Sequence, residues 1–405
     1  MTAGGRFLFV TWPGGGNLPP LLALGVMLTE RGHEVTVVAP EAIRGRVEAE
    51  GLGFEAHRTP AGWCGGEGFT WPPGPTPEQQ LACLRGLASD VDAALDRRPV
   101  DIAIVDYMQP EALSAVERRR VPTAAFVHTL YWRVARGPFS PMEMVSGGRD
   151  PVNAVRAELG LAAVDALPEM LDTAARVLVT VPRQLDRPDS PDSPDSPGSS
   201  DDADRTNVRY VGPIVERPGP DAGWTPPWSA DQRQRSRPAI LISISTIAST
   251  DQAVELLQRV IDAASDLPVT LFVTTTDEAK TGLRPSANTH LSSYVRHSAV
   301  LPHVDLFVTH AGLSSVGAAV HFGVPMVCIP QFHEQPANAE HVAAAGLGRA
   351  LPTDAPAAGI RTAIEAALVD DEMRATAAAM SAHLRDQPGG VHPAVRELES
   401  LLGRS

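Results

Sequence analysis

The feature that most constrains the fold is an alternation of short apolar segments with helix-forming segments, which runs through the chain twice. The first half holds four apolar segments of this kind, RFLFVTW, HEVTVVAP, DIAIVDYM and PTAAFVHT. The second half begins the alternation again with AILISIST, PVTLFVTTT, DLFVTHAG and PMVCIP. Buried strands separated by helices form parallel sheets that are covered by helices on both faces. The sequence therefore predicts an α/β protein with two doubly wound, Rossmann-like domains.

Two stretches of biased composition divide the chain into domains. The Asp-Ser-Pro repeats at about 187–204 offer no apolar face to bury, so we expect a disordered insertion there. The proline-rich segment 218–238 is the expected interdomain linker. We therefore predict an N-terminal domain at 1–217, a C-terminal domain at 239–380, and a last helix in 381–405 that packs back towards the N-terminal domain. The carboxyl ends of both sheets are expected to face a shared cleft, where such sheets bind ligands.

Composition narrows the class of partner. The formal net charge of −14 argues against nucleic acid or an anionic membrane surface as the main partner. The three cysteines have no spacing typical of a metal site, so we expect free thiols in a reducing compartment and no bound metal. We expect no signal peptide in MTAGGRFLFV and no membrane span, because no segment has a long enough apolar run. The prediction is a soluble, cytoplasmic protein that acts on small molecules.

The stretch from 305 to 351 carries the strongest functional signal. An apolar strand ends at Thr309 and is followed by His310. Gly312 allows a tight turn, after which Ser314 and Ser315 open a helix. Free backbone amides at a helix start, two hydroxyls and an imidazole together favour a bound diphosphate. Taken singly, such a histidine is more often structural and such serines are more often N-caps, and it is their order that indicates a site.

A second polar cluster, QFHEQ, follows the next apolar strand and opens another helix. Glu334 and Gln335 in this cluster are suited to hydrogen bonds with the hydroxyl groups of a sugar. By themselves these two residues would more often form a solvated first helical turn. Because they follow a turn of the diphosphate-binding type, the sequence predicts a site for a sugar linked to a diphosphate.

The whole series resembles the donor-binding signature of inverting, nucleotide-sugar-dependent glycosyltransferases of the GT-B fold. The resemblance is strongest to the actinobacterial natural-product branch of the UDP-glycosyltransferase-like enzymes. The family pattern is His-x-Gly, Gly-Val-Pro, Pro-x-x-x-Asp/Glu-Gln-x-x-Asn-Ala and Gly-x-Gly, in that order. This chain matches the pattern at His310 and Gly312, Gly323–Pro325, Pro330 with Glu334 and Gln335, Asn338 and Ala339, and Gly346 with Gly348. Weaker resemblance extends over nearly the whole chain.

The resemblance implies how the diphosphate of the donor is held. The expected diphosphate-binding residues are His310, Gly312, Ser314, Ser315 and Thr246, the last of which ends the apolar segment AILISIST. The resemblance also implies that no metal ion is needed, since His310 and the helix dipole neutralise the leaving diphosphate.

The sugar and the base of the donor have matching residues as well. The pair Glu334–Gln335 matches the sugar-binding pair of the family, and Asn338 belongs to the same signature. Tyr294, with His297 close to it, matches the segment that lies against the base. Arg296 stands where the family usually has proline, which is a departure from the pattern on the base side.

One position bears on the choice of nucleotide. In the UDP-sugar enzymes of this family, a glutamate on the helix after the His-x-Gly turn usually binds both ribose hydroxyls. Ala318 stands at that place here. Alanine cannot accept a hydrogen bond from a 2′-hydroxyl, and thymidine diphosphate sugars have no 2′-hydroxyl. The sequence therefore favours a dTDP-activated deoxysugar as the donor. In the alternative, a UDP-sugar is the donor and a nearby residue does the work of the glutamate.

The general base, which takes the proton from the acceptor hydroxyl, is identified less clearly than the donor-binding residues. The family usually has a histidine in the first loop as the general base, oriented by an aspartate after a later strand. Asn17 stands at the place of this histidine, and an amide cannot act as a base near pH 7, whereas Asp106 matches the aspartate. Three explanations stay open. Asp106 acts as the base directly or through a water while Asn17 orients the acceptor, which we rank first. His128 or His333 serves instead, or the acceptor is itself a good nucleophile.

The acceptor pocket is expected from two irregular stretches, 60–75 and 131–148, which are rich in glycine, proline and large apolar side chains. The expected lining residues are Trp63, Phe69, Trp132, Met142 and His333, with Gly15 and Gly16 allowing the backbone to approach the substrate closely. Packing of these loops against the protein itself is the plainer interpretation.

The predicted function is the inverting, metal-independent transfer of a deoxysugar from a dTDP-sugar to an apolar natural-product acceptor, as in antibiotic biosynthesis. The alternatives are a UDP-sugar transferase, another GT-B enzyme such as a sugar-nucleotide epimerase, or a catalytically silent helper of a partner transferase. No cofactor is expected beyond the nucleotide sugar as co-substrate, and a homodimer is compatible with the sequence.

Overall fold

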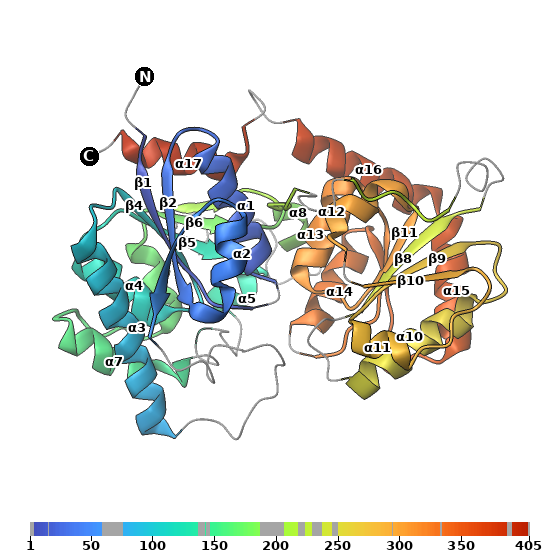
Figure 1. The fold of residues 1–405 in the computed structure, drawn as a ribbon, viewed down its shortest axis with the longest axis horizontal. Coiled ribbons are helices and arrows are strands. Elements are labelled where there is room, and N and C mark those ends of the chain that lie inside the picture. Colours follow the sequence, from blue (N-terminus) through green and yellow to red (C-terminus); the bar gives the residue numbers. More distant parts are fainter. Residues whose placement is uncertain are drawn as a thin grey trace. The chain divides into compact units, whose positions relative to one another are not determined.

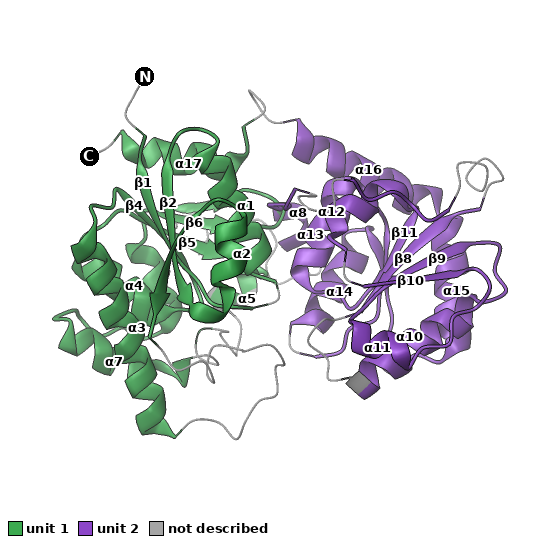
Figure 2. Ribbon diagram, in the orientation of Figure 1, with its two compact units in different colours: residues 1–182, 191–212, 391–405 green, residues 183–190, 213–390 purple. Residues whose placement is uncertain are grey.

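The computed structural model describes residues 4–14, 16–58, 76–136, 142, 146–186, 206–217, 223–228, 237–244, 250–293, 295–332, 334–386 and 391–403. The chain divides into two compact units (Figure 2). Unit 1 consists of Met1–Pro182, Pro191–Gly212 and Val391–Ser405. Unit 2 consists of Arg183–Ser190 and Pro213–Gly390.

The unit boundaries differ in detail from the predicted domain limits. The predicted C-terminal domain stops at 380, but α16 (Asp371–Arg385) is one continuous helix that belongs to unit 2. Asp370 caps the first turn of α16. The helix continues past 380, where the hydroxyl of Ser381 donates to the backbone carbonyl of His321. The segments 187–205, 218–222 and 229–236, which hold the predicted insertion and most of the predicted linker, lie outside the described residues.

Unit 1 contains a seven-stranded parallel sheet with the strand order β3-β2-β1-β4-β5-β6-β7. The strands are β1 (Arg6–Val10), β2 (Glu34–Pro40), β3 (Gly53–His57), β4 (Ile102–Asp106), β5 (Thr123–Val127), β6 (Arg176–Val179) and β7 (Val208–Tyr210). The central strands β1, β4 and β5 are almost wholly buried, as their continuous apolar sequences predict.

Helices cover both faces of this sheet. They are α1 (Leu18–Thr29), α2 (Arg44–Ala49), α3 (Pro77–Arg97), α4 (Pro110–Arg118), α5 (Tyr131–Arg136), α7 (Arg149–Glu158) and α17 (Pro393–Leu402), with short 3₁₀ segments η1 (Glu41–Ile43) and η2 (Leu167–Thr173). In Figure 1, α3, α4 and α7 lie on one side of the sheet and α1 and α2 on the other. The last helix, α17, packs on α1 and β4, and Glu397 binds Arg176 of β6 at 2.6 Å.

Unit 2 contains a six-stranded sheet with the order β10-β9-β8-β11-β12-β13, and it is parallel throughout. Its strands are β8 (Ala239–Ser243), β9 (Thr270–Thr274), β10 (Thr289–Ser292), β11 (Leu306–Thr309), β12 (Met326–Cys328) and β13 (Gly348–Ala350). Its helices are α8 (Arg183–Asp186), α10 (Thr250–Ala264), α11 (Asp277–Thr281), α12 (His297–Val300), α13 (Leu313–Phe322), α14 (Gln335–Ala344), α15 (Ala357–Leu368) and α16, with the 3₁₀ segment η4 (Leu301–His303). The core lies between β8, β9 and β11 and the helices α10 and α15.

The strand order of each sheet reverses at one point. In unit 1 the reversal falls between β1 and β4, and in unit 2 it falls between β8 and β11. At such a point the crossover helices leave to opposite faces, and a crevice opens at the carboxyl ends of the two strands. The prediction of two doubly wound parallel sheets is thus confirmed, and each sheet supplies one natural position for a ligand. Within the described part of the chain, no helix combines the length and apolar character that crossing a membrane would require.

Candidate active site

The donor-side turn follows β11 at the strand-order reversal of unit 2. His310 is the first residue after the strand, and Ala311 adopts a left-handed conformation with φ of 64°. A β-carbon on Gly312 would lie 2.5 Å from the Nε2 atom of His310. Glycine is therefore required here by close approach of the imidazole and not by its own φ of −61°. The His-x-Gly pattern thus corresponds to packing of the His310 ring against a residue that has no side chain.

Asn338 of α14 holds this turn in place. Its side-chain Nδ2 donates to the carbonyl oxygen of Ala311 at 2.9 Å, and the residue is only 1% exposed. The backbone amide of Ala311 donates in turn to the hydroxyl of Thr309 at 3.3 Å. These two hydrogen bonds support the backbone of Ala311, whose positive φ is unfavourable for residues other than glycine. Asn338 thus acts on the donor site through the backbone, a role that the sequence did not assign to it.

Burial decides the charge of His310. It lowers the pKa of His310 to about 4, while a hydrogen bond between the ring and the backbone of Ser243 at the end of β8 acts in the opposite direction. At neutral pH the imidazole is therefore uncharged, and its single N–H is engaged by the backbone of Ser243. A bound diphosphate would bring negative charge next to the ring and favour its protonated form.

The start of α13 offers backbone amides to the same place. Gly312 is the N-cap residue and has no side chain to accept from the first turn of the helix, so these amides lack a side-chain partner. Ser314 is partly exposed there, whereas Ser315 is 7% exposed. An uncapped helix start with a serine hydroxyl and an imidazole beside it is suited to an anion.

The predicted sugar-binding pair divides into two roles. Gln335 is buried, and its Oε1 accepts from the backbone amides of Gln331 at 2.9 Å and Phe332 at 3.3 Å. This residue therefore shapes the loop that precedes α14. Glu334 is the N-cap residue of α14 but its side chain makes no capping hydrogen bond, and it is partly exposed. The carboxylate of Glu334 is therefore not used in capping, whereas Gln335 is engaged through its Oε1.

The base-side residues lie near the start of α12. His297 packs edge-on against the ring of Phe307 at 5.1 Å, and burial lowers its pKa to about 4. Arg296 lies 3.7 Å from Glu216 and donates to the backbone carbonyl of Arg217 at 3.0 Å. Arg296, which stands where the family usually has proline, thus connects residues 216–217 to the start of α12. Tyr294 and Thr246 lie outside the described residues.

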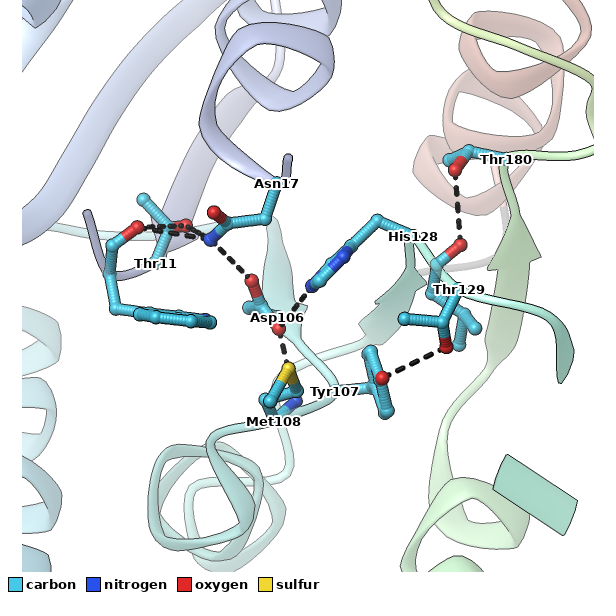
Figure 3. Close-up of polar contacts among 10 residues, drawn as sticks. Thr11, Asn17, Asp106, Tyr107, Met108, His128, Thr129 and Thr180 are labelled. Atoms are coloured by element: carbon cyan, nitrogen blue, oxygen red, sulfur yellow. Dashed lines mark hydrogen bonds and ion pairs between the residues drawn. The ribbon is translucent and has the colours of Figure 1, made fainter. Parts of the chain in front are cut away.

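A second cluster surrounds Asp106 at the strand-order reversal of unit 1 (Figure 3). Asp106 ends β4 and is fully buried. Its Oδ2 accepts from Nδ2 of Asn17 at 2.8 Å, and its Oδ1 accepts from the backbone amide of Met108 at 3.0 Å. The Nε2 atom of His128, the first residue after β5, lies 3.2 Å from the same Oδ1. The structure therefore joins three of the predicted site residues around one carboxylate.

The side-chain Nδ2 of Asn17 is committed to this cluster. Besides Asp106, its Nδ2 donates to the hydroxyl of Thr11 at 3.1 Å and to the carbonyl oxygen of Trp12 at 3.0 Å. Asn17 is 1% exposed. Its amide therefore fixes the carboxylate of Asp106 and ties the loop after β1 to it.

A further carboxyl group, which the sequence did not single out, lies close to this cluster. Glu111, in the first turn of α4, is buried, and burial raises its pKa to about 8, with the negative charge of Asp106 adding to the effect. Glu111 is consequently protonated at neutral pH and does not compete with Asp106 for hydrogen-bond donors. Glu111 directly follows Pro110, as an acidic residue in an ordinary first helical turn does, so the sequence did not indicate that its carboxyl group is buried.

The predicted acceptor-side residues are only partly described. Gly16 is exposed, and Trp132 of α5 is partly exposed. Met142 is wholly buried, and its carbonyl oxygen accepts from the hydroxyl of Ser146 at 2.7 Å, so in this structure its side chain belongs to the interior of unit 1. The remaining predicted residues, Gly15, Trp63, Phe69 and His333, lie outside the described residues. Among the residues that are described, no cluster of three or more His, Cys, Asp or Glu side chains is arranged to hold a metal ion.

Comparison with known proteins agrees with this architecture. Residues 229–396 match the family described as UDP-glucoronosyl and UDP-glucosyl transferase. The chain is 28% identical over 426 residues to a 4'-demethylrebeccamycin synthase of Lentzea aerocolonigenes, which covers 95% of this chain and 96% of that protein.

Two solved structures share the fold along almost their whole length. The glycosyltransferase of kitacinnamycin superposes with a TM-score of 0.74 at 23% identity, over 99% of this chain and 100% of that one. SsfS6, a glycosyltransferase of Streptomyces sp. SF2575 complexed with thymidine diphosphate, superposes with a TM-score of 0.67 at 19% identity, over 98% and 99% of the two chains. The chain therefore shares the fold of these GT-B glycosyltransferases, and residues 229–396 carry sequence similarity to the UDP-glucoronosyl and UDP-glucosyl transferase family.

Proposed function

We propose that this glycosyltransferase moves a deoxysugar from a dTDP-sugar to an apolar natural-product acceptor, with inversion at the anomeric carbon and without a metal ion. The observation that supports a nucleotide-sugar donor is the turn at 310–312. Asn338 holds this turn next to the uncapped start of α13. In the reaction, an oxygen of the acceptor attacks the anomeric carbon while the bond from that carbon to the diphosphate breaks. The backbone amides of α13 and the imidazole of His310 stabilise the negative charge that develops on the diphosphate.

The proposal of a thymidine nucleotide rests on Ala318 in α13. Ala318 is 7% exposed and has no hydrogen-bonding side chain, so it offers nothing to a ribose 2′-hydroxyl. A relative of the same fold, SsfS6, has been solved with thymidine diphosphate. A 2′-hydroxyl that entered an unmatched environment would lose its hydrogen bonds to water, which disfavours UDP.

Binding of free nucleotides tests this proposal without knowledge of the acceptor. Calorimetry on the purified protein should compare dTDP, UDP and dUDP, because dUDP lacks both the 2′-hydroxyl and the thymine methyl group. We expect dTDP and dUDP to bind similarly, and both to bind more tightly than UDP. Equal affinity for dUDP and UDP would contradict the role of Ala318. Ala318→Glu is expected to reduce the difference in affinity between dUDP and UDP. The ratio of the two Kd values is independent of the fraction of the variant that folds.

Transfer itself is tested with dTDP-glucose and UDP-glucose against a panel of phenols. We expect glycoside formation in the presence of EDTA, and a product whose anomeric configuration is opposite to that of the donor. Nucleotide binding without transfer to any phenol or natural aglycone would favour a helper protein instead. Loss of transfer in EDTA that Mg²⁺ restores would contradict metal independence.

A further inference from the structure

Direct displacement by a hydroxyl group needs a base on the acceptor side, and Asn17 cannot supply it. An amide has no basic nitrogen near neutral pH. The Nδ2 atom of Asn17 is also occupied by three acceptors, on Thr11, Trp12 and Asp106. The position at which the resemblance expects the base therefore holds a structural amide.

Asp106 is also poorly placed to take a proton from an acceptor. Its side chain is fully buried, and both of its oxygens accept hydrogen bonds from within the protein. These bonds hold the carboxylate in one orientation. A fully buried carboxylate can orient a neighbouring side chain, but an acceptor hydroxyl does not reach it from solvent.

His128 has the geometry that the other two residues lack. A carboxylate only accepts, so the contact of 3.2 Å with Asp106 places the proton of the neutral ring on Nε2 and leaves a lone pair on Nδ1. Among the described residues Nδ1 takes no hydrogen bond, and it is not one of the buried polar atoms without a partner, so it is open to solvent. The side chain as a whole is 10% exposed.

The surroundings of His128 hold the ring in one orientation. Its centroid lies 5.2 Å from that of Tyr107 and 6.4 Å from that of Phe126. The titratable groups near the ring are Asp106, the hydroxyl of Tyr107, which is hydrogen-bonded to Thr129 at 2.9 Å, and Glu111 beyond Asp106. A histidine held at one nitrogen by a buried carboxylate, with the other nitrogen open, is the arrangement of a general base.

We propose that His128 is the general base of this glycosyltransferase, with Asp106 and Asn17 as positioning residues. The inference rests on the proposed function. As the acceptor oxygen bonds to the anomeric carbon, its proton passes to Nδ1 of His128, and the electron pair of the breaking bond leaves with the diphosphate. Asp106 stabilises the imidazolium that forms, and Asn17 holds Asp106. The base thus comes from the end of β5 and not from the loop after β1.

The test uses the full chain with one sugar donor and two acceptors, an unsubstituted phenol and a nitrophenol. The nitrophenol is ionised near neutral pH and needs no base, whereas the phenol keeps its proton. We expect His128→Gln to lower kcat for phenol by about 10²-fold or more and to affect the nitrophenol far less. The pH profile of kcat for phenol should differ between wild type and the variant, whereas the profile for the nitrophenol should not.

Thr180→Val is the matched control, since it removes a hydroxyl that bonds to Val127, the neighbour of His128, without touching Asp106. Its rates should match those of wild type, and dTDP affinity should be the same in all three proteins. A wild-type rate with phenol in His128→Gln would overturn the assignment, as would an equal loss with both acceptors. If wild type transferred sugar to neither acceptor while binding nucleotide, the proposed function would fail instead.

Discussion

The side chain of Asn338 reaches from α14 to the carbonyl oxygen of Ala311, and this single bond of 2.9 Å fixes the backbone that carries His310 and Gly312. The contact joins the second half of the donor signature to the first half. It explains physically why an asparagine belongs to a pattern whose histidine lies 28 positions earlier.

Asn338→Leu should weaken nucleotide binding. Leucine has a similar size but no donor, so the left-handed conformation of Ala311 loses its support, at a cost of about 1–3 kcal/mol. We expect the Kd of dTDP to rise about tenfold or more in calorimetry. Asn288→Leu is the control, because Nδ2 of Asn288 also donates to a backbone carbonyl, that of Ala264 at 3.0 Å, at the opposite end of the sheet. Equal affinities in the two variants would contradict a specific role for Asn338.

Gly312→Ala should displace the imidazole of His310. The new methyl group would lie 2.5 Å from Nε2, so the ring must move, although the backbone of Gly312 itself tolerates alanine. We expect the affinity for dTDP to fall by at least about tenfold, with a small loss of stability. Gly359→Ala in α15 adds a methyl group that meets nothing closer than 3.6 Å and should leave binding unchanged. Wild-type affinity in Gly312→Ala would show that the ring does not contact the nucleotide.

Unit 2 should lose stability on acidification because of His297. Its pKa is lowered to about 4 in the folded chain, whereas an unfolded histidine titrates at about 6.5. Between these values the unfolded chain binds more protons, so this part of the stability is present above about pH 6.5 and is lost as the pH falls towards 4. Urea unfolding of His297→Phe, which keeps an aromatic ring against Phe307, should show a smaller change between pH 7 and pH 5. An unchanged pH dependence would contradict the prediction.

Glu111 should show the opposite pH dependence. Its pKa of about 8 in the folded chain exceeds the unfolded value of about 4.3, so wild type loses stability as the pH rises between them. Glu111→Gln removes this ionisation and keeps the shape of the neutral acid. The variant should gain stability relative to wild type as the pH increases from 5 to 8 in urea unfolding. Glu340→Gln, at an exposed position, should show no such trend, and parallel curves for both variants would count against a buried acid.

The sequence predicted the fold well because both of its determinants are local. Continuous apolar strands and short helices specify parallel sheets, and the donor motif lies within one stretch of chain. The meeting of Asn17, Asp106 and His128 is also within reach of the sequence. Asp106 ends β4, His128 directly follows β5, and Asn17 lies in the loop between β1 and α1, while β1, β4 and β5 are neighbours in the sheet.

What the sequence left unresolved depends on how side chains pack between distant segments. Asn338 and Gln335 are expected at the donor, and the sequence did not show that their side chains also bond to backbone groups of neighbouring loops. Met142, which is expected to line the acceptor pocket, is buried, and apolar character alone does not distinguish a pocket wall from a core. The raised pKa of Glu111 arises from burial, which no pattern around Pro110 announces.

The position of the Asp106 cluster has a consequence for how such an enzyme can diverge. Asp106 ends β4, His128 follows β5 and Asn17 precedes α1, and none of them comes from 60–75 or from 131–148. Those two segments can therefore change in length and composition while the proton-transfer apparatus stays fixed. Under the proposed function, acceptor choice and bond formation would then be separate parts of unit 1, and exchange of these segments would change the aglycone without changing the general base.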